Sequence, residues 1–339
     1  MIFFTSINYN YFSKASLLAQ SVKAVYPESL FIVMLTEREI NDEIKPTKDI
    51  DQIILTKDIG FGTYEKFIFK FNVVEACTAV KGQAFDYIFN NFEEHNKVVY
   101  LDPDICLYSK MDELEKNLES KEIILTPHLS SPENKDTFKA TVEAVMDNEL
   151  AALKHGVYNL GFLALKKGKE STKFVDWWKS RLEMFCYNDI PNGIFTDQKW
   201  CDLAPAFFDV SILKHPGYNV APWNISNRLI KKDAGQYTSN GQPLRFFHFS
   251  GFDSGANEAM IMKYSNSKDV IKLRDEYVEK LRKFGKQTKT IPWSYNYYLS
   301  GETIDPQIRR MYRENPNIFK NIYDPFFESN NSIRNLSFS

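Results

Sequence analysis

The chain has few cysteines, and none of them is paired at the spacing of a known motif. The four are far apart, with no Cys-x-x-Cys and no Cys/His pair at zinc-ligand spacing: Cys77, Cys106, Cys186 and Cys201. This spacing argues against a disulfide framework and a structural zinc module. We therefore expect reduced thiols in a reducing compartment.

Charge of one sign and long apolar runs are also missing. Lys plus Arg number 42 and Asp plus Glu 44, so the net charge is -2. The basic excess typical of proteins that grip long nucleic acid is absent, and we expect no nucleic-acid partner. No window approaches the roughly 18 consecutive apolar residues of a membrane span, and the start, MIFFTSINYN, lacks the regions of a signal peptide. These absences predict a soluble, cytoplasmic protein.

Aromatic residues are abundant. They make up 15% of the 339 residues, with 27 Phe and 18 Tyr, within an ordinary hydrophobic content of 43%. The length allows two domains or one large one. We expect most of the rings to fill a core, although composition leaves open whether some line a binding groove.

The first half of the chain alternates short apolar runs with segments of helical periodicity. The apolar runs, each typical of a buried strand, are residues 2–7, 30–35, 52–55, 97–101 and 122–126. The helical segments are 11–26, 65–80, which ends near Lys81-Gly82, and 84–92. Such alternation predicts an α/β fold with a mostly parallel sheet and helices on both faces.

The regular alternation of apolar runs and helical segments ends at about residue 150. Strands are predicted at 157–165, 210–214 and 244–249, and helices at 171–185 and 197–208. At least one of Trp177 and Trp178 should face the core, the alternative being that they stack on a sugar. Gly60-x-Gly62 is expected to be a turn, because a phosphate loop needs a third glycine and a helix N-cap.

The C-terminal part is predicted to be a helical and irregular extension. Residues 263–289 carry nine Lys or Arg against four Asp or Glu at helical periodicity. This is typical of a solvated face, and the alternative is contact with an anionic membrane surface. The last fifty residues, rich in Asn, Pro, Tyr and Phe, lack clear periodicity. Their aromatic cluster, 293–327, is a candidate for acceptor contact.

Two carboxylates follow one of the predicted strands directly. Asp102 and Asp104 are separated only by Pro103, so both side chains should point the same way at the C-terminal edge of the sheet. Ligands bind at this edge in open α/β sheets. Two carboxylates this close repel each other unless a cation lies between them, which predicts a Mg²⁺ or Mn²⁺ site.

A histidine on a late apolar run is the second candidate ligand. His248 is followed by Ser250 and Gly251, where the backbone can turn close to an anion. An isolated histidine on such a run is often only a core residue. If it binds the cation, its imidazole favours Mn²⁺ over Mg²⁺.

The order of five motifs resembles a known family. They are YLDPDI at 100–105, YNLGF at 158–162, TDQ at 196–198, APWN at 221–224 and HFSG at 248–251. This order is similar to that of the nucleotide-sugar glycosyltransferases of the GT-A fold. The resemblance is greatest to family 8, the retaining group of glycogenin and bacterial lipopolysaccharide galactosyltransferases. It covers residues 1–255, and within the family it points to a bacterial branch apart from glycogenin.

The resemblance implies a mixed, mostly parallel Rossmann-like sheet, a catalytic domain over 1–255 and an extension over 256–339. It also implies a role for each matching residue. The metal ligands would be Asp102, Asp104 and His248. The donor-binding residues would be Thr5, Ser6, Asn8, Lys81, Asp102, Asn159, Gly161 and Gly251. The residues beside the reacting anomeric carbon would be Asp197 and Gln198.

The chain departs from the family pattern at two places. The family has a Lys after H-x-x-G, whereas this chain continues Gly251-Phe252-Asp253-Ser254. The positive charge for the phosphates must come from elsewhere, and Lys81 and the basic segment 263–289 are the candidates. The third position of the family's D-Q-D is Lys199.

The function implied is transfer of a sugar from a nucleoside-diphosphate sugar, expected to be a UDP-sugar, to a hydroxyl of a glycan or lipid-linked acceptor, with retention. Mn²⁺ or Mg²⁺ would be the cofactor, and bacterial polysaccharide synthesis a fitting context. One alternative is a nucleotidyltransferase that makes the nucleotide sugar, but its G-x-G-T/S-x-R loop is replaced here by Thr5-Ser6-Ile7-Asn8. The other is a non-catalytic sugar-binding protein, against which both metal carboxylates argue.

Overall fold

The computed structural model describes residues 1–41, 47–133, 142–265, 267–285 and 291–327. At its centre is a seven-stranded sheet in the order β10-β6-β7-β4-β1-β2-β3. The strands are β1 (Ile2–Ile7), β2 (Leu30–Leu35), β3 (Gln52–Leu55), β4 (Lys97–Leu101), β6 (Ile123–Pro127), β7 (Tyr158–Lys166) and β10 (Val210–Ile212). Strand β7 is antiparallel to both of its neighbours, and the other pairings are parallel. The predicted mixed, mostly parallel α/β sheet is confirmed.

Both faces of the sheet are covered, because nearly every residue of β1, β2, β4, β6 and β7 is buried, whereas the edge strands β3 and β10 are partly exposed. In β1, Phe4 belongs to one hydrophobic core and Phe3 to a second core on the opposite face. Alternation along an extended chain explains this division. The continuous apolar runs in the sequence are therefore those of strands covered on both sides.

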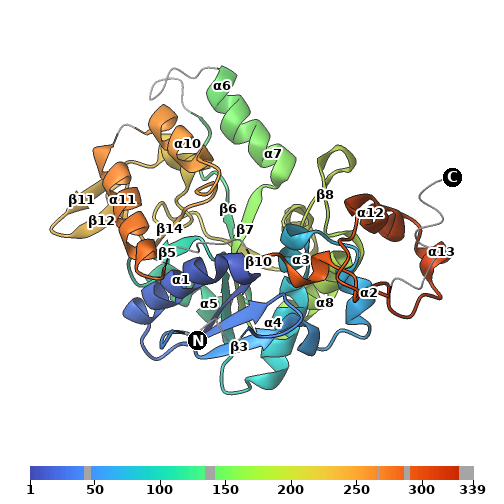
Figure 1. The fold of residues 1–339 in the computed structure, drawn as a ribbon. Coiled ribbons are helices and arrows are strands. Elements are labelled where there is room, and N and C mark those ends of the chain that lie inside the picture. The colour runs from blue at the N-terminus through green and yellow to red at the C-terminus, as the bar shows by residue number, and fades with distance from the viewer. Residues whose placement is uncertain (42–46, 134–141, 266, 286–290, 328–339) are drawn as a thin grey trace.

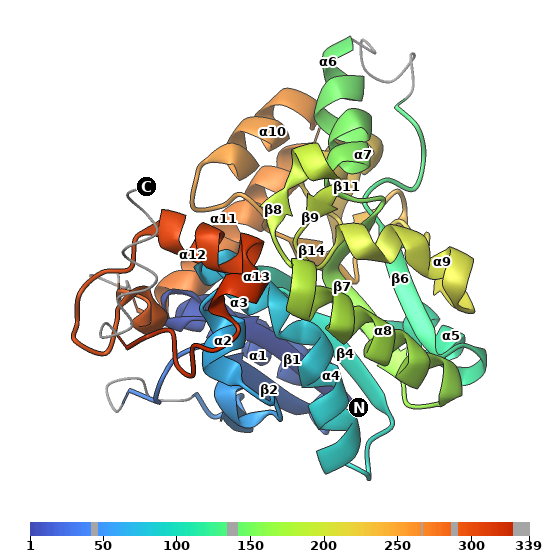
Figure 2. The same cartoon turned by 90° about the vertical axis from the view of Figure 1, so that its right-hand side faces the viewer.

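Helices cover both faces (Figures 1 and 2). The core that contains Phe4 also contains side chains of α2 (Tyr64–Ile68), α3 (Val73–Ala79), α4 (Lys81–Asn91) and α8 (Lys169–Phe185). The core that contains Phe3 includes side chains of α1 (Phe12–Val25) and α5 (Asp112–Ser120). Trp178 of α8 is fully buried and Trp177 packs partly buried beside Phe208, which confirms that at least one of this pair lies in the core.

A third core lies to one side of the sheet. It joins α10 (Ala256–Tyr264) and α11 (Lys268–Arg282) to four short strands and to α6 (Val142–Ala144). The strands are β5 (Ile105–Leu107), which pairs with β14 (Phe246–His248), and the hairpin of β11 (Ile230–Asp233) and β12 (Gln236–Ser239), to which β13 (Gln242–Pro243) adds an edge. The predicted strand at 244–249 therefore pairs outside the main sheet.

The remaining elements are short. A π-helical stretch, residues 145–150, joins α6 to α7 (Ala151–His155). The continuous helix from α6 to α7 projects from the molecule in both views (Figures 1 and 2). Further along the chain are the two-residue strands β8 (Asn188–Asp189) and β9 (Ile194–Phe195) and the helix α9 (Ala204–Phe207). No periodicity of the residues predicted the helix at 142–155.

The predicted helix at 65–80 is two helices, α2 and α3. Asn72 interrupts it, because its side chain accepts hydrogen bonds from the backbone N–H groups of Val74 and Glu75 and so begins α3 with a capping box. Gly82 does not end a helix but lies within α4. A Cβ atom there would be 2.8 Å from Cα of Lys179, so the glycine allows α4 and α8 to pack closely.

The last part of the described chain returns to the sheet and ends in α12 (Pro306–Glu314) and α13 (Pro316–Phe319). Six of its aromatic side chains are buried in the core that contains Phe4: Trp293, Tyr295, Tyr298, Tyr312, Phe319 and Phe326. These rings are therefore structural, and predicted acceptor contact by this segment now rests on the exposed Tyr323 and Phe327. The division at residue 255 stays a prediction.

Two predictions about individual residues also have an outcome. All four cysteines carry free thiols. Gly60 has a φ of 94° in a turn, as expected for the Gly60-x-Gly62 segment. Within the described ranges, none of the helices combines the length and the apolar character that crossing a membrane requires.

Candidate metal and nucleotide site

The two carboxylates occupy a tight turn at the end of β4. Ile105 N–H donates a hydrogen bond of 3.0 Å to the Asp102 carbonyl oxygen, which closes a four-residue turn with Pro103 at its second position. Proline favours that position, because its ring fixes the φ value that the turn requires. The chain then enters β5, so both carboxylates stand at the carboxyl edge of the sheet.

Strand pairing brings a distant histidine to this turn. β14 pairs antiparallel with β5, and His248 lies opposite Ile105 in the register. The N–H of Phe249 donates to the carbonyl oxygen of Asp104 at 2.8 Å, which fixes the end of the ladder beside the turn. A backbone ladder therefore sets the position of the imidazole.

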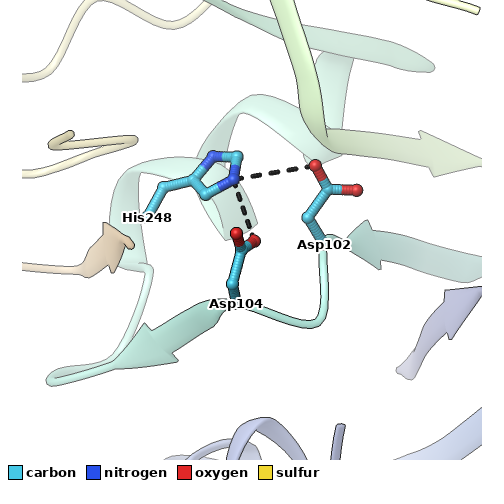
Figure 3. Close-up of side chains that lie close together, drawn as sticks. All are labelled: Asp102, Asp104 and His248. Carbon is cyan, nitrogen blue, oxygen red and sulfur yellow. Dashed lines mark ion pairs between the residues drawn. The ribbon is translucent and has the colours of Figure 1, made fainter. Parts of the chain in front are cut away.

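The three side chains converge (Figure 3). Nε2 of His248 lies 3.0 Å from Oδ1 of Asp104 and 3.7 Å from Oδ2 of Asp102. One potential ligand atom from each residue lies within 4.8 Å of the other two. Two carboxylate oxygens and one imidazole nitrogen are a donor set that suits Mn²⁺ and is compatible with Mg²⁺. The predicted metal ligands are thus brought together.

The electrostatics of this cluster favour a cation. Burial disfavours the charged imidazole, but the attraction of Asp104 and Asp102 outweighs burial and raises the pKa of His248. Burial likewise opposes ionisation of Asp104, yet His248 holds the pKa of this carboxyl below its usual value. A pair of carboxylates that raises the pKa of a neighbouring imidazole is a site that positive charge stabilises.

A buried lysine stands behind the turn. Nζ of Lys81 lies 2.8 Å from Oδ2 of Asp197 and 3.4 Å from Oδ1 of Asp102, and it donates to the carbonyl oxygen of Leu160 at 3.1 Å. Burial disfavours its charge, but Asp102 and Asp197 outweigh burial and raise the pKa of Lys81. Lys81 is therefore committed to carboxylates and a carbonyl, which leaves it little capacity for a phosphate.

Asp197 is buried beside Lys81. Burial raises the pKa of Asp197, while Lys81 acts in the opposite direction. Thr196 Oγ1 donates to Oδ1 of Asp197 at 3.1 Å. The carboxylate is thus held in one orientation at the floor of the site.

An amide network joins the predicted residues of β7 to Gln198. Oε1 of Gln198 accepts hydrogen bonds from Asn159 Nδ2 at 3.2 Å and from Leu160 N at 3.0 Å. Its Nε2 donates to the carbonyl oxygen of His155 at 3.0 Å. The amide of Gln198 is therefore engaged on both sides and acts first as a support for β7. Beyond it, Gly161 accepts from the N–H of Asp102 at 2.8 Å, which ties β7 to the turn.

Two adjoining cavities open on the carboxylates. The larger, about 390 Å³, is lined by predicted residues that include Lys81, Asn159, Gly161, Asp197, Gln198 and His248. The smaller, about 190 Å³, is lined by Ser6, Asn8, Tyr11 and Tyr100. Asp102 and Asp104 line both. The metal cluster therefore stands at the junction of the two cavities.

Two predicted residues are placed differently. Thr5 is completely buried in β1 and lines neither cavity. Successive side chains of a strand point to opposite faces, so Thr5 points away from the smaller cavity that Ser6 lines. Gly251 lines neither of these two cavities, whereas Ser250 lines the larger one. Gly251 has a φ of 72°, so its place in the turn after His248 is its clearest feature.

Sequence patterns missed several residues of the site. Tyr100 donates from its hydroxyl to Oδ1 of Asp102 at 2.6 Å, and Nζ of Lys81 lies 4.1 Å from its ring centroid. Trp223 packs edge-on against His248 with ring centroids 5.1 Å apart. His128 also packs against Trp223, with ring centroids 5.3 Å apart, and burial lowers the pKa of His128 to about 4. Trp223 and Tyr100 belong to the APWN and YLDPDI motifs, while no pattern marked His128.

Comparisons with known proteins give distant relatives. No family model matches the sequence. Two proteins of Bacillus subtilis (strain 168) are similar to it, the uncharacterized proteins YfnF and YfnD. YfnF is 26% identical over 229 residues, which are 67% of this chain and 73% of YfnF. YfnD is 25% identical over 181 residues, which are 52% of this chain and 54% of YfnD.

Solved structures with some similarity are glycosyltransferases. The galactosyltransferase LgtC, crystallised with donor and acceptor sugar analogs, has a TM-score of 0.41 at 14% identity and covers 83% of this chain and 100% of its own. GlyE of Streptococcus pneumoniae TIGR4 has a TM-score of 0.42 at 16% identity and covers 83% of this chain and 63% of its own. These similarities carry no argument about activity, and the function proposed below rests on the residues of the site.

Proposed function

We propose that the chain is a metal-dependent glycosyltransferase that moves a sugar from a nucleoside diphosphate to a hydroxyl group. The observation that carries this proposal is the convergence of Asp102, Asp104 and His248 at the junction of two cavities. A diphosphate bound to a cation at that junction can extend its nucleoside into one cavity and its sugar into the other. The proposal extends to a retaining reaction like that of family 8, which the order of the sequence motifs supports.

The smaller cavity suits the nucleoside. Ser6 and Asn8 offer polar groups at the end of β1, and Tyr11 offers an aromatic wall. An aromatic face with a few polar groups is the usual composition of a nucleoside pocket. Thr5 contributes to this arrangement through the strand rather than by contact.

The cation is proposed to be Mn²⁺ or Mg²⁺, held by Asp102, Asp104 and His248. When bound, it would supply Lewis-acid neutralisation of the charge that develops on the departing diphosphate. The protein holds the ligand atoms in place through the turn at Pro103 and the β5–β14 ladder.

The larger cavity suits the donor sugar and the acceptor hydroxyl. Asp197, fixed by Lys81, is proposed to face the anomeric carbon, where a carboxylate stabilises developing positive charge. Gln198 and Asn159 position the strand that carries Gly161. The acceptor class is a glycan or a lipid-linked sugar, and contact with the 256–339 extension or a membrane surface remains part of the proposal.

A panel of nucleotide sugars tests this function. We expect release of nucleoside diphosphate from one sugar donor when Mn²⁺ is present, and a transferred sugar whose anomeric configuration, read by NMR, is retained. Formation of a nucleotide sugar from a sugar phosphate and a nucleoside triphosphate would instead identify a nucleotidyltransferase. Binding of a sugar without any release would identify a non-catalytic protein.

A further inference from the structure

A second lysine, besides Lys81, is buried near the cavities. Lys14 is in the first turn of α1, and only 7% of its side chain is exposed. Its ammonium group lies 4.6 Å from the ring centroid of Tyr11, which lines the smaller cavity. Lys14 therefore lies beside the wall of the smaller cavity, whose lining also includes Asp102 and Asp104.

The partner of Lys14 is unusual for a buried charge. Its ammonium group forms an ion pair with Asp253, whose side chain is 62% exposed. Asp253 lies in the turn that follows His248, and Ser250 of that turn lines the larger cavity. Because Asp253 is exposed, water can solvate its carboxylate after Lys14 leaves it, and Lys14 stays paired as long as another anion takes the place of Asp253.

The charges around the metal cluster are compatible with Lys14 exchanging Asp253 for a diphosphate. Four carboxylates, Asp102, Asp104, Asp197 and Asp253, would be balanced by Lys14, Lys81 and the proposed divalent cation. The diphosphate of a donor adds further negative charge, and Lys81 is already held by two carboxylates and a carbonyl. If Asp253 moves toward solvent, Lys14 becomes available to that added charge.

We propose that Lys14 binds the diphosphate of the nucleotide and that Asp253 releases Lys14 when the nucleotide enters. This inference rests on the proposed function, because it presumes that a nucleoside diphosphate occupies the junction. It assigns the positive charge that the sequence motif after His248 lacks to a residue of α1. A lysine amine suits this task, since it binds phosphate as a compact point charge.

Isothermal titration of the full chain with Mn²⁺ present tests the inference. UDP, GDP, CDP and ADP are titrated into the wild type, and the best ligand is carried to three variants. We expect Lys14→Met to weaken binding of this diphosphate by about 10- to 100-fold, the range for a hydrogen bond between charged groups. Binding of the corresponding nucleoside, followed by ligand-detected NMR, should not change. Lys23→Met on the same helix, whose lysine pairs with Asp51 at 2.7 Å, is the matched control and should bind the diphosphate as the wild type does.

Asp253→Asn distinguishes a Lys14 that binds the diphosphate from a Lys14 whose ion pair with Asp253 is only structural. Removal of the competing carboxylate should tighten binding of the diphosphate about threefold or more, and this variant decides the question if Lys14→Met does not fold. If both variants weaken the diphosphate equally, or if neither changes it, the inference is overturned while the proposed function stands. A wild type that binds none of the four diphosphates would overturn the proposed function, and the inference with it.

Discussion

Gly161 lies so close to His248 that a Cβ atom at position 161 would be 2.4 Å from Cε1 of the imidazole. No side chain fits there without moving the histidine. We predict that Gly161→Ala lowers the affinity for Mn²⁺ by about 10- to 100-fold, as changes behind a metal ligand commonly do. Titration followed by electron paramagnetic resonance measures this affinity. Gly62→Ala is the control, because a Cβ atom at Gly62 meets nothing within 4 Å. Equal loss in both variants, or none in Gly161→Ala, would show that the glycine does not support the site.

Asp104 is predicted to be indispensable for transfer. Asp104→Ala should leave less than about 1% of the wild-type activity, because charge stabilisation by a bound metal contributes several kcal/mol to the transition state. The fold should persist, since the carboxylate is a site residue rather than a core residue. Rates of nucleoside diphosphate release measure the effect, and circular dichroism checks the fold. Asp176→Ala, with its carboxylate 61% exposed on α8, serves as the control. Near-normal activity of Asp104→Ala would refute the metal assignment.

Lys81 is predicted to stabilise the fold through Asp102 and Asp197. Lys81→Met leaves a buried carboxylate unpaired, which should cost roughly 3–5 kcal/mol of unfolding free energy at neutral pH. Burial raises the folded-state pKa of Asp197 even with Lys81 present, and removal of Lys81, which acts in the opposite direction, should raise it further. The loss should therefore be smallest in acid and grow as the pH rises through the folded-state pKa.

Urea unfolding from about pH 4, near the pKa of an unperturbed Asp, up to about pH 8 measures this dependence. The double variant Lys81→Met/Asp197→Asn should recover most of the stability, because neither partner remains charged. A double variant as unstable as the single one would mean that Lys81 acts by packing alone.

His128 should also make the unfolding free energy depend on pH, but here stability falls as the pH falls. Burial lowers its pKa to about 4 from 6.5, so the unfolded chain binds a proton that the folded chain does not in this range. Stability from this residue is complete above pH 6.5 and is lost as the pH falls toward about 4. Between pH 6.5 and about 4, the wild type should lose unfolding free energy through His128. We predict that His128→Phe removes roughly 3 kcal/mol of this loss, or about 1.4 kcal/mol per pH unit. His95→Gln is the control. An unchanged pH profile in His128→Phe would refute the assignment.

Trp293 tests whether the late aromatic segment is structural. Its indole N–H donates to the carbonyl oxygen of Thr36 at 2.7 Å, and only 2% of the residue is exposed. Trp293→Ala should destabilise the fold by roughly 3–5 kcal/mol. Tyr323→Ala, at a residue that is 92% exposed, should leave stability unchanged. Thermal unfolding compares the two, and a Trp293→Ala variant as stable as the wild type would return this ring to the candidates for acceptor binding.

Much of the fold follows from local pattern. The apolar runs and the helical spacing of the first 126 residues predict the parallel part of the sheet, because each of these strands is covered on both faces. The break at Asn72 and the start of α4 before Gly82 were not predicted. Both depend on contacts that spacing does not reveal, namely a capping side chain and the approach of Lys179 from α8.

The candidate site likewise combines a part that local sequence predicts with a part that depends on distant contacts. The turn Asp102-Pro103-Asp104 is local, so its geometry can be predicted from the residues themselves. The approach of His248 depends on the pairing of β14 with β5, which joins distant segments. Its neighbouring residues made it a candidate ligand, and the resemblance to a family implied that it binds the same metal as the two carboxylates. Lys14 and His128 carry no motif. Their proximity to the site follows from tertiary packing, and no periodicity of the sequence could have indicated it.

The central claim is that Asp102, Asp104 and His248 form one divalent metal site that binds a nucleoside diphosphate. Its most direct test is a Mn²⁺ titration by electron paramagnetic resonance, with and without the diphosphate that binds best. We predict one tightly bound ion per chain, an affinity that rises when the diphosphate is added, and loss of both in Asp104→Ala. Binding of Mn²⁺ that is indifferent to the diphosphate, or equal in Asp104→Ala and the wild type, would contradict the account.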